Sequence, residues 1–124
     1  MLDRAKVLVF LPAMAGIIAF YEGNGASQNV IQAVEDYPGQ DFRPIADNAI
    51  RSLKLYNVRS GAEIRVYDSA AGATDDDFCV IRVKRVAPEY VLQSFERTFE
   101  DEYVMVTFIR NNGLDGQISR ILIM

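Results

Sequence analysis

The sequence predicts an all-β fold, a sandwich built from two Greek-key motifs. Two observations indicate it. From Gly16 onward, short apolar runs alternate with turn-forming residues, the pattern of antiparallel strands joined by tight connections. A short acidic segment that leads into an aliphatic strand also occurs twice, as Asp47–Ser52 and as Asp115–Arg120. Such an internal repeat indicates that one supersecondary unit is used twice.

The first unit is expected over residues 16–59 and contains four strands. Pro, Gly and Asn separate these strands, because such residues fit the backbone angles of tight turns. The expected strands are Gly16–Tyr21, Ser27–Val34, Asp41–Ile45 and Ser52–Val58. Four short strands, with the repeated segment just before the last, match one Greek key.

The second unit is expected over residues 60–124 and is longer than the first. Between Phe78 and Arg85 the side chains alternate, which places Cys79, Ile81 and Val83 on one face of a strand. The other expected strands are Glu63–Asp68, Tyr90–Phe95, Tyr103–Arg110 and Gln117–Met124, with an acidic connection at Glu96–Glu102. Because 68 positions separate Asp47 from Asp115, we expect an extra hairpin in the second key.

Composition excludes several classes of function. The 124 residues predict a single domain, here residues 16–124, with a core large enough to need no disulfide. Histidine is absent and Cys79 is the one cysteine, which removes the usual nucleophile–base pairs and thiolate zinc sites. The net charge of −4 argues against binding to nucleic acid. No pair of carboxylates is set apart for acid–base catalysis, so we do not expect an enzyme.

Residues 1–15 form either a signal-like segment or an additional N-terminal segment. A short basic start, the apolar run Val7–Leu11 and the small residues of Ala13–Ala15 are typical of a cleavable secretion signal. This interpretation predicts a secreted or extracellular protein, and the alternative predicts a cytoplasmic one. The segment is too short to span a bilayer.

The repeated segment resembles the motif of the βγ-crystallins, of the form Asn/Asp-Asn/Asp-x-x-Ser/Thr-Ser. The two copies here are Asp47-Asn48-Ala49-Ile50-Arg51-Ser52 and Asp115-Gly116-Gln117-Ile118-Ser119-Arg120. In this family the motif occurs once in each of two Greek keys and binds Ca²⁺ in many microbial members. The resemblance covers about residues 16–123, and the longer second key departs from the usual spacing.

The resemblance implies a set of Ca²⁺ ligands that differs between the two copies. Oxygens would come from Glu22, Asp47, Asn48, Ala49, Asp68, Asp115, Gln117 and Ser119, with Glu22 and Asp68 offering hairpin carbonyls. The fifth motif position, a hydroxyl ligand in the family, is Arg51 in the first copy and Ser119 in the second. Because a guanidinium has only donors and a fixed positive charge, Arg51 disables the first site. Ser52 is expected to bond backbone groups rather than an ion. We therefore expect one degraded site and one Ca²⁺ site of modest affinity.

Simpler interpretations stay open beside this one. Asp-Asn and Asp-Gly are ordinary turn dipeptides. Arg51 could pair with a carboxylate such as Asp47 or Asp115 and take the role of the ion. The run Asp75–Asp77 is expected to be a solvated loop tip. The predicted function is a calcium-binding structural or extracellular module, and the alternative is a secreted proteinase-inhibitor or toxin-like protein on the same fold, which would use the acidic connection to reach a protein partner.

Overall fold

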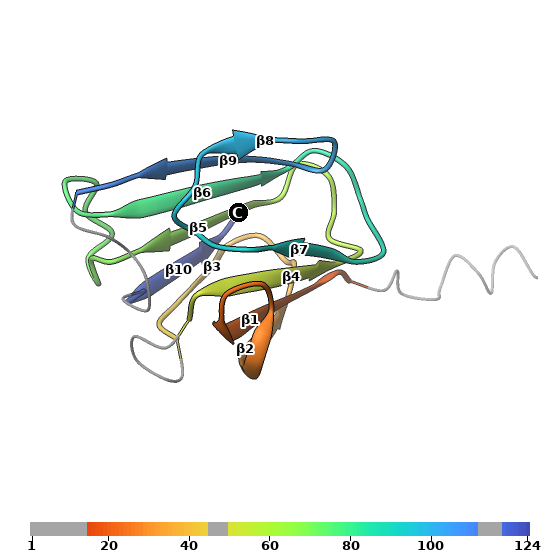
Figure 1. The fold of residues 1–124 in the computed structure, drawn as a ribbon, viewed down its shortest axis with the longest axis horizontal. Coiled ribbons are helices and arrows are strands. Elements are labelled where there is room, and N and C mark those ends of the chain that lie inside the picture. The colour runs from red at the N-terminus through yellow and green to blue at the C-terminus, as the bar shows by residue number, and fades with distance from the viewer. Residues whose placement is uncertain (1–14, 45–49, 112–117) are drawn as a thin grey trace, which may run out of the picture.

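The computed structural model describes residues 15–44, 50–111 and 118–124, which form two antiparallel β-sheets (Figure 1). The four-stranded sheet has the order β2 (Ser27–Glu35), β1 (Ile17–Gly23), β4 (Ser52–Tyr56) and β7 (Tyr90–Leu92). The six-stranded sheet has the order β3 (Gln40–Phe42), β10 (Arg120–Ile123), β5 (Glu63–Tyr67), β6 (Phe78–Val83), β9 (Val104–Ile109) and β8 (Phe99–Glu100). The all-β sandwich predicted from the sequence is confirmed.

The two sheets repeat one arrangement of strands. Strand β1 lies between β2 and β4, and β5 lies between β6 and β10 in the same way. The registers match, since Phe20 faces Leu53 and Tyr21 faces Ser52 in one pair, while Val66 faces Ile121 and Tyr67 faces Arg120 in the other. The third strand of each unit crosses to the other sheet: β3 pairs with β10, and β7 pairs with β4. The two units are therefore interlocked by exchanged strands.

The extra hairpin of the second unit is formed by β8 and β9. Strand β9 pairs along the whole of β6, and β8 adds the outermost strand of the six-stranded sheet (Figure 1). Strand β8 lies within Glu96–Glu102, where the sequence predicts a connection and no strand. The Thr98 hydroxyl accepts a hydrogen bond from the Phe108 amide at 2.9 Å and holds the start of this strand against β9.

One apolar core fills the space between the sheets. The inward side chains of both sheets are fully buried, among them Phe20, Leu53, Ile64, Ile81 and Ile121. Each such residue adds roughly 1.5–3 kcal/mol when it leaves water.

Strand β6 has the predicted alternation. Cys79, Ile81 and Val83 are buried, whereas Arg82 on the other face is exposed. Burial raises the pKa of the Cys79 thiol to about 12. The thiol therefore stays neutral and behaves as a small apolar side chain.

The described part of the chain contains no helix with the length and apolar character needed to cross a membrane. The signal-like segment, except for Ala15, lies outside the described residues.

Candidate functional site

Five of the residues predicted for the two motifs lie in described parts of the chain: Glu22, Arg51, Ser52, Asp68 and Ser119. They fall where the paired strands of each unit begin or end, β1 with β4 and β5 with β10. The other predicted ligands, Asp47, Asn48, Ala49, Asp115 and Gln117, lie outside the described residues. For each of the two predicted sites, the structure therefore describes the residues on the hairpin side.

The first motif is fastened to the β1–β2 hairpin by Ser52. This serine is completely buried, and its hydroxyl donates a hydrogen bond of 2.5 Å to the Gly23 carbonyl. The same oxygen accepts a bond of 2.9 Å from the Ala26 amide. Gly25, at the tip, has a φ of 67°, a left-handed conformation that glycine adopts with little strain. One hydroxyl therefore satisfies a donor and an acceptor of a tight turn.

The Arg51 side chain lies over the same hairpin. Its backbone amide donates to the Tyr21 carbonyl at 2.9 Å, and its guanidinium donates to the Glu22 carbonyl at 3.1 Å. The Glu22 carbonyl is the oxygen that the family resemblance assigns to a cation at this motif. In this structure it accepts a hydrogen bond from a fixed positive charge of the chain itself. Such an oxygen is a poor ligand for Ca²⁺, because the guanidinium repels a second cation.

The second motif has the same backbone arrangement and a different side chain. The Ser119 amide donates to the Tyr67 carbonyl at 2.8 Å, as the Arg51 amide does to the Tyr21 carbonyl. Ser119 therefore occupies the position equivalent to Arg51, in agreement with the alignment of the motifs. It is half-buried and lies next to the hairpin that begins with Asp68. At this place the second motif offers a hydroxyl where the first offers a guanidinium.

Negative charge accumulates beside Ser119. The pKa of Asp68 is raised above its ordinary value, first by burial and then by the charges of Asp76 and Asp77 and a hydrogen bond with Asp76. Within the described chain, no basic side chain forms an ion pair with Asp68 or Asp76. Burial and neighbouring carboxylates both disfavour the charged form of a carboxyl group, which raises its pKa. The described surroundings of Asp68 are therefore partly buried and acidic.

The expectation of a solvated tip at Asp75–Asp77 is wrong for Asp77. Its side chain is completely buried, and one carboxylate oxygen accepts a hydrogen bond from the Asn111 amide beyond the end of β9. The Asp77 carbonyl also accepts the Asp68 amide at 3.0 Å, which closes the base of the β5–β6 loop. The hydrogen bond from a backbone donor offsets part of the cost of burying this carboxylate. Its place directly before the apolar strand Phe78–Val83 is the sequence signal.

Arg120 is not among the residues that the sequence predicts for the site, yet its side chain makes several hydrogen bonds beside the second motif. Its guanidinium donates two bonds to the Asp41 carboxylate, at 2.9 and 2.6 Å, and one of 2.8 Å to the Ala71 carbonyl. Arg120 occupies the sixth motif position, which is Ser52 in the first copy. It fastens the β5–β6 loop and ties it to β3 of the first unit. The missed signal is the reversed order, Arg-Ser in one copy and Ser-Arg in the other.

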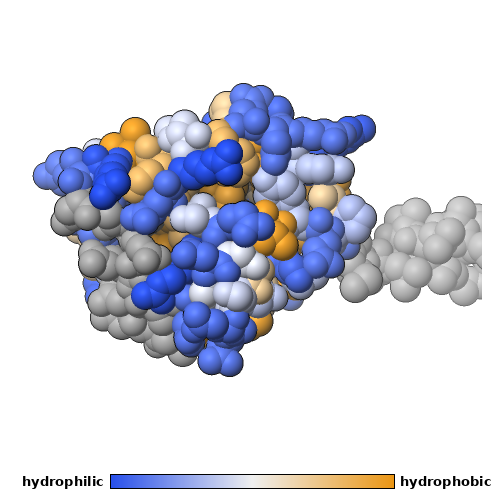
Figure 2. Space-filling model, in the orientation of Figure 1, coloured by the Kyte–Doolittle hydropathy of each residue, from blue (hydrophilic) through white to orange (hydrophobic). Residues whose placement is uncertain are grey.

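The acidic connection Glu96–Glu102 uses part of its charge within the molecule. Glu100 pairs with Lys84 at 2.5 Å, and Glu102 pairs with Arg85. Figure 2 shows hydrophilic residues over most of the visible face, interrupted by small apolar patches. The connection therefore has less unpaired negative charge than its sequence indicates.

No protein-family model, curated protein or solved structure matches this chain. Among the described residues, no group of three or more Cys, Asp and Glu side chains is arranged to hold a metal ion. A Ca²⁺ site here would have to combine hydroxyl and carbonyl oxygens with ligands from residues 47–49 and 115–117. The first motif end offers that site a guanidinium, and the second offers Ser119 beside an acidic hairpin.

Proposed function

We propose that this protein is a βγ-crystallin-like module with one Ca²⁺ site, at the second motif. One observation carries the proposal. Residues 51 and 119 hold equivalent positions, with amides bonded to equivalent tyrosine carbonyls, but one is an arginine that donates to the hairpin carbonyl and the other is a serine beside Asp68. At the first motif the arginine takes the role of an ion.

The strand arrangement supports the family resemblance. The two units repeat one arrangement of strands, as the resemblance to a domain of two Greek keys implies. The repeated motif precedes the last strand of each unit, β4 and β10. The β8–β9 hairpin is an addition at the outer edge of the second unit and leaves the two motif strands paired as in the first.

The donor set fits Ca²⁺ at the second motif and does not fit at the first. Ca²⁺ prefers hard oxygen ligands and a negative surround. The Ser119 hydroxyl and the Asp68 carbonyl would hold the ion on the hairpin side, and the Gln117 carbonyl with an oxygen of Asp47 or Asn48 would complete it. The bound ion would supply positive charge beside Asp68 and stabilise the native state. This role agrees with a structural or extracellular module.

The test is Ca²⁺ binding by calorimetry, together with thermal unfolding in chelator, in millimolar Ca²⁺ and in millimolar Mg²⁺. A ligand at a hundred times its Kd stabilises the native state by about 2.7 kcal/mol, which raises Tm by several degrees. We expect Ca²⁺ to raise Tm with a stoichiometry of one ion per chain. Ser119→Ala should abolish the rise, whereas Ser60→Ala, the same change at the opposite end of β5, should leave it intact.

The Arg51→Ser variant tests the other half of the proposal. It removes the guanidinium from the Glu22 carbonyl and restores a hydroxyl, so we expect a second Ca²⁺ per chain to bind. A wild-type chain that binds no Ca²⁺, or whose binding survives Ser119→Ala, would refute the proposed site. If Arg51→Ser binds no further ion, the role given to Arg51 is refuted.

The inhibitor or toxin-like function stays a prediction. It rests on the signal-like segment and on the extended second key, and a panel of proteinases with a growth assay tests it directly. Inhibition of a proteinase or of growth by the protein in chelator, unchanged in Ser119→Ala, would favour this function over the calcium module.

A further inference from the structure

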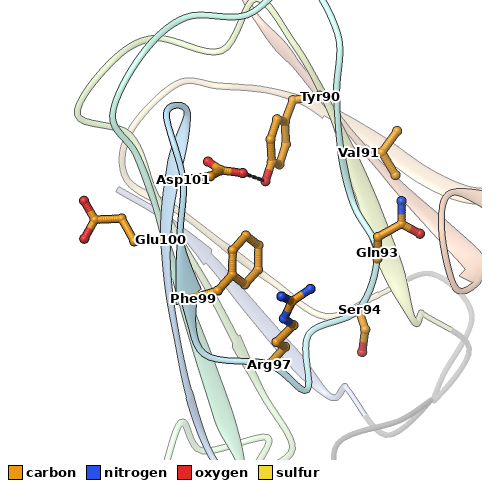
Figure 3. Close-up of a pocket in the computed structure, with 8 residues that line it drawn as sticks. All are labelled: Tyr90, Val91, Gln93, Ser94, Arg97, Phe99, Glu100 and Asp101. Atoms are coloured by element: carbon orange, nitrogen blue, oxygen red, sulfur yellow. Dashed lines mark hydrogen bonds between the residues drawn. The ribbon is translucent and has the colours of Figure 1, made fainter.

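A cavity of about 370 Å³ lies between β7 and the β8–β9 hairpin, and none of its lining residues belongs to either motif. Its size is within the lower range of small-molecule sites. In Figure 3 the rings of Tyr90 and Phe99 and the guanidinium of Arg97 converge on this space, whereas the Gln93 amide is directed away from it, toward Gly25 of the β1–β2 hairpin. Figure 3 also shows the Glu100 carboxylate pointing away. The cavity therefore combines two aromatic walls with one cation.

Arg97 is the charged group that the cavity presents. Its guanidinium lies 4.9 Å from the centre of the Phe99 ring, a cation–π contact that orients it over an apolar wall. The residue is exposed, and with the residues that the structure describes it forms no ion pair. An arginine fixed by stacking on a ring keeps its planar set of donors available for a planar carboxylate.

The carboxylates near the cavity are engaged by other groups. Asp101 accepts hydrogen bonds from the Tyr90 hydroxyl at 2.5 Å and from the amides of Tyr103 and Val104 at 2.8 and 2.9 Å. Burial alone would raise the pKa of Asp101, but these bonds and the nearby Lys84 lower it. Glu100 is paired with Lys84. Neither acid is paired with Arg97, so its guanidinium remains available to a ligand.

The walls are held before any ligand arrives. The Tyr90–Asp101 hydrogen bond joins the β7 side to the hairpin side, and Phe99 packs against the buried core. The Gln93 carbonyl accepts the Gly25 amide at 2.9 Å, which anchors the β7 side to the β1–β2 hairpin. A preorganised site loses less entropy on binding.

We infer that this cavity binds a small aromatic carboxylate. The Arg97 guanidinium holds the carboxylate, and the flat apolar body of the ligand lies between the Tyr90 and Phe99 rings. This site is separate from the proposed Ca²⁺ site and does not depend on it.

The probe is 2-naphthoate, titrated into the ¹⁵N-labelled full-length chain in chelator and followed by amide chemical shifts. Two control ligands are matched to it: 2-naphthamide lacks the charge, and acetate lacks the ring. We expect saturable shifts at residues 90–101 with naphthoate, and binding about tenfold weaker with either control, the loss expected for one charge-assisted contact or one ring contact.

Two variants with the same charge change locate the contact. Arg97→Gln should weaken naphthoate binding about tenfold and leave naphthamide binding unchanged. Arg43→Gln, an exposed arginine after β3, should change neither, and the spectra report directly whether each variant is folded. The inference is overturned if naphthoate gives no saturable shift at these residues, if naphthamide binds as tightly, or if Arg97→Gln has no effect on naphthoate.

Discussion

The two motif ends share one backbone arrangement and exchange their side chains. Arg51 and Ser119 each donate an amide to the tyrosine carbonyl of the facing strand, and Ser52 and Arg120 follow them in equivalent register. In the first end the serine is inside the hairpin and the arginine covers a carbonyl; in the second the arginine holds the loop and the serine is left beside an acid. A reversal of two neighbouring residues thus separates an end whose hairpin carbonyl is bonded by an arginine from an end at which we propose a cation site.

The lengths of the hairpins explain why the reversal is tolerated. The β1–β2 turn is short, so a serine hydroxyl reaches both Gly23 and Ala26. The β5–β6 loop is longer, and the extended Arg120 side chain is needed to reach the Ala71 carbonyl. Gly72 lies under this arm, since a Cβ there would come within 2.9 Å of the guanidinium and its φ is 74°. At each motif end, the side chain that fastens the hairpin therefore has the length needed to reach its backbone partners.

The largest effect is expected from Ser52→Ala. The change removes the partner of the Gly23 carbonyl and of the Ala26 amide, and unsatisfied buried groups cost about 1–3 kcal/mol each. We expect the free energy of unfolding to fall by about 2–3 kcal/mol and Tm to fall by roughly 10 °C. Thermal and urea unfolding measure the change. The control is Ser60→Ala, where an exposed hydroxyl bonds only the Lys84 carbonyl; equal losses in the two variants would contradict the role of Ser52.

A smaller loss is expected from Arg120→Gln, the equivalent change in the second end. The Arg120–Asp41 pair lies at the surface, and exposed pairs contribute little, so Tm should fall by roughly a third as much as in Ser52→Ala. Hydrogen bonds from Arg120 lower the pKa of Asp41. A lowered folded-state pKa gives stability that is present above the unfolded-state pKa and is lost as pH falls through the folded-state pKa. The gap between the wild type and Arg120→Gln, measured by thermal unfolding, should therefore narrow below about pH 4; a gap that persists there would show that the Ala71 bond carries the effect.

The sequence predicts the sandwich and its repeat because both depend on local patterns. The alternation over Phe78–Val83 and the two motif copies are visible without tertiary contacts. It does not predict that β8 and β9 extend the six-stranded sheet, because edge pairing depends on long-range contacts. Asp77 and Arg120 were misjudged for the same reason: their partners, Asn111 and Asp41, are distant in sequence. Asp47, Asn48, Ala49, Asp115 and Gln117 stay predictions.

The smallest effect, and the sharpest for the comparison, is expected from Asp68→Asn. Burial and the neighbouring Asp76 and Asp77 raise the folded-state pKa of Asp68, so the native state holds a proton more tightly than the unfolded chain. Stability then falls as pH rises from the unfolded-state to the folded-state pKa, and the full penalty is present above the latter. In chelator at pH 7, Asp68→Asn should raise the free energy of unfolding by about 0.5 kcal/mol or less, because solvent screens a group that is only partly buried.

Asp75→Asn is the matched control for Asp68→Asn, since it removes one charge from the exposed part of the same loop. The rise in the free energy of unfolding caused by Asp68→Asn should vanish in acid. In Ca²⁺ the same variant should be less stable than the wild type, because the Asp68 charge would attract the ion, whereas in the calcium-free protein that charge is destabilising. Urea unfolding at pH 7 and in acid, with and without Ca²⁺, measures all four values. A destabilised Asp68→Asn in chelator would mean that the chain itself compensates Asp68, and the second end would then be closed like the first.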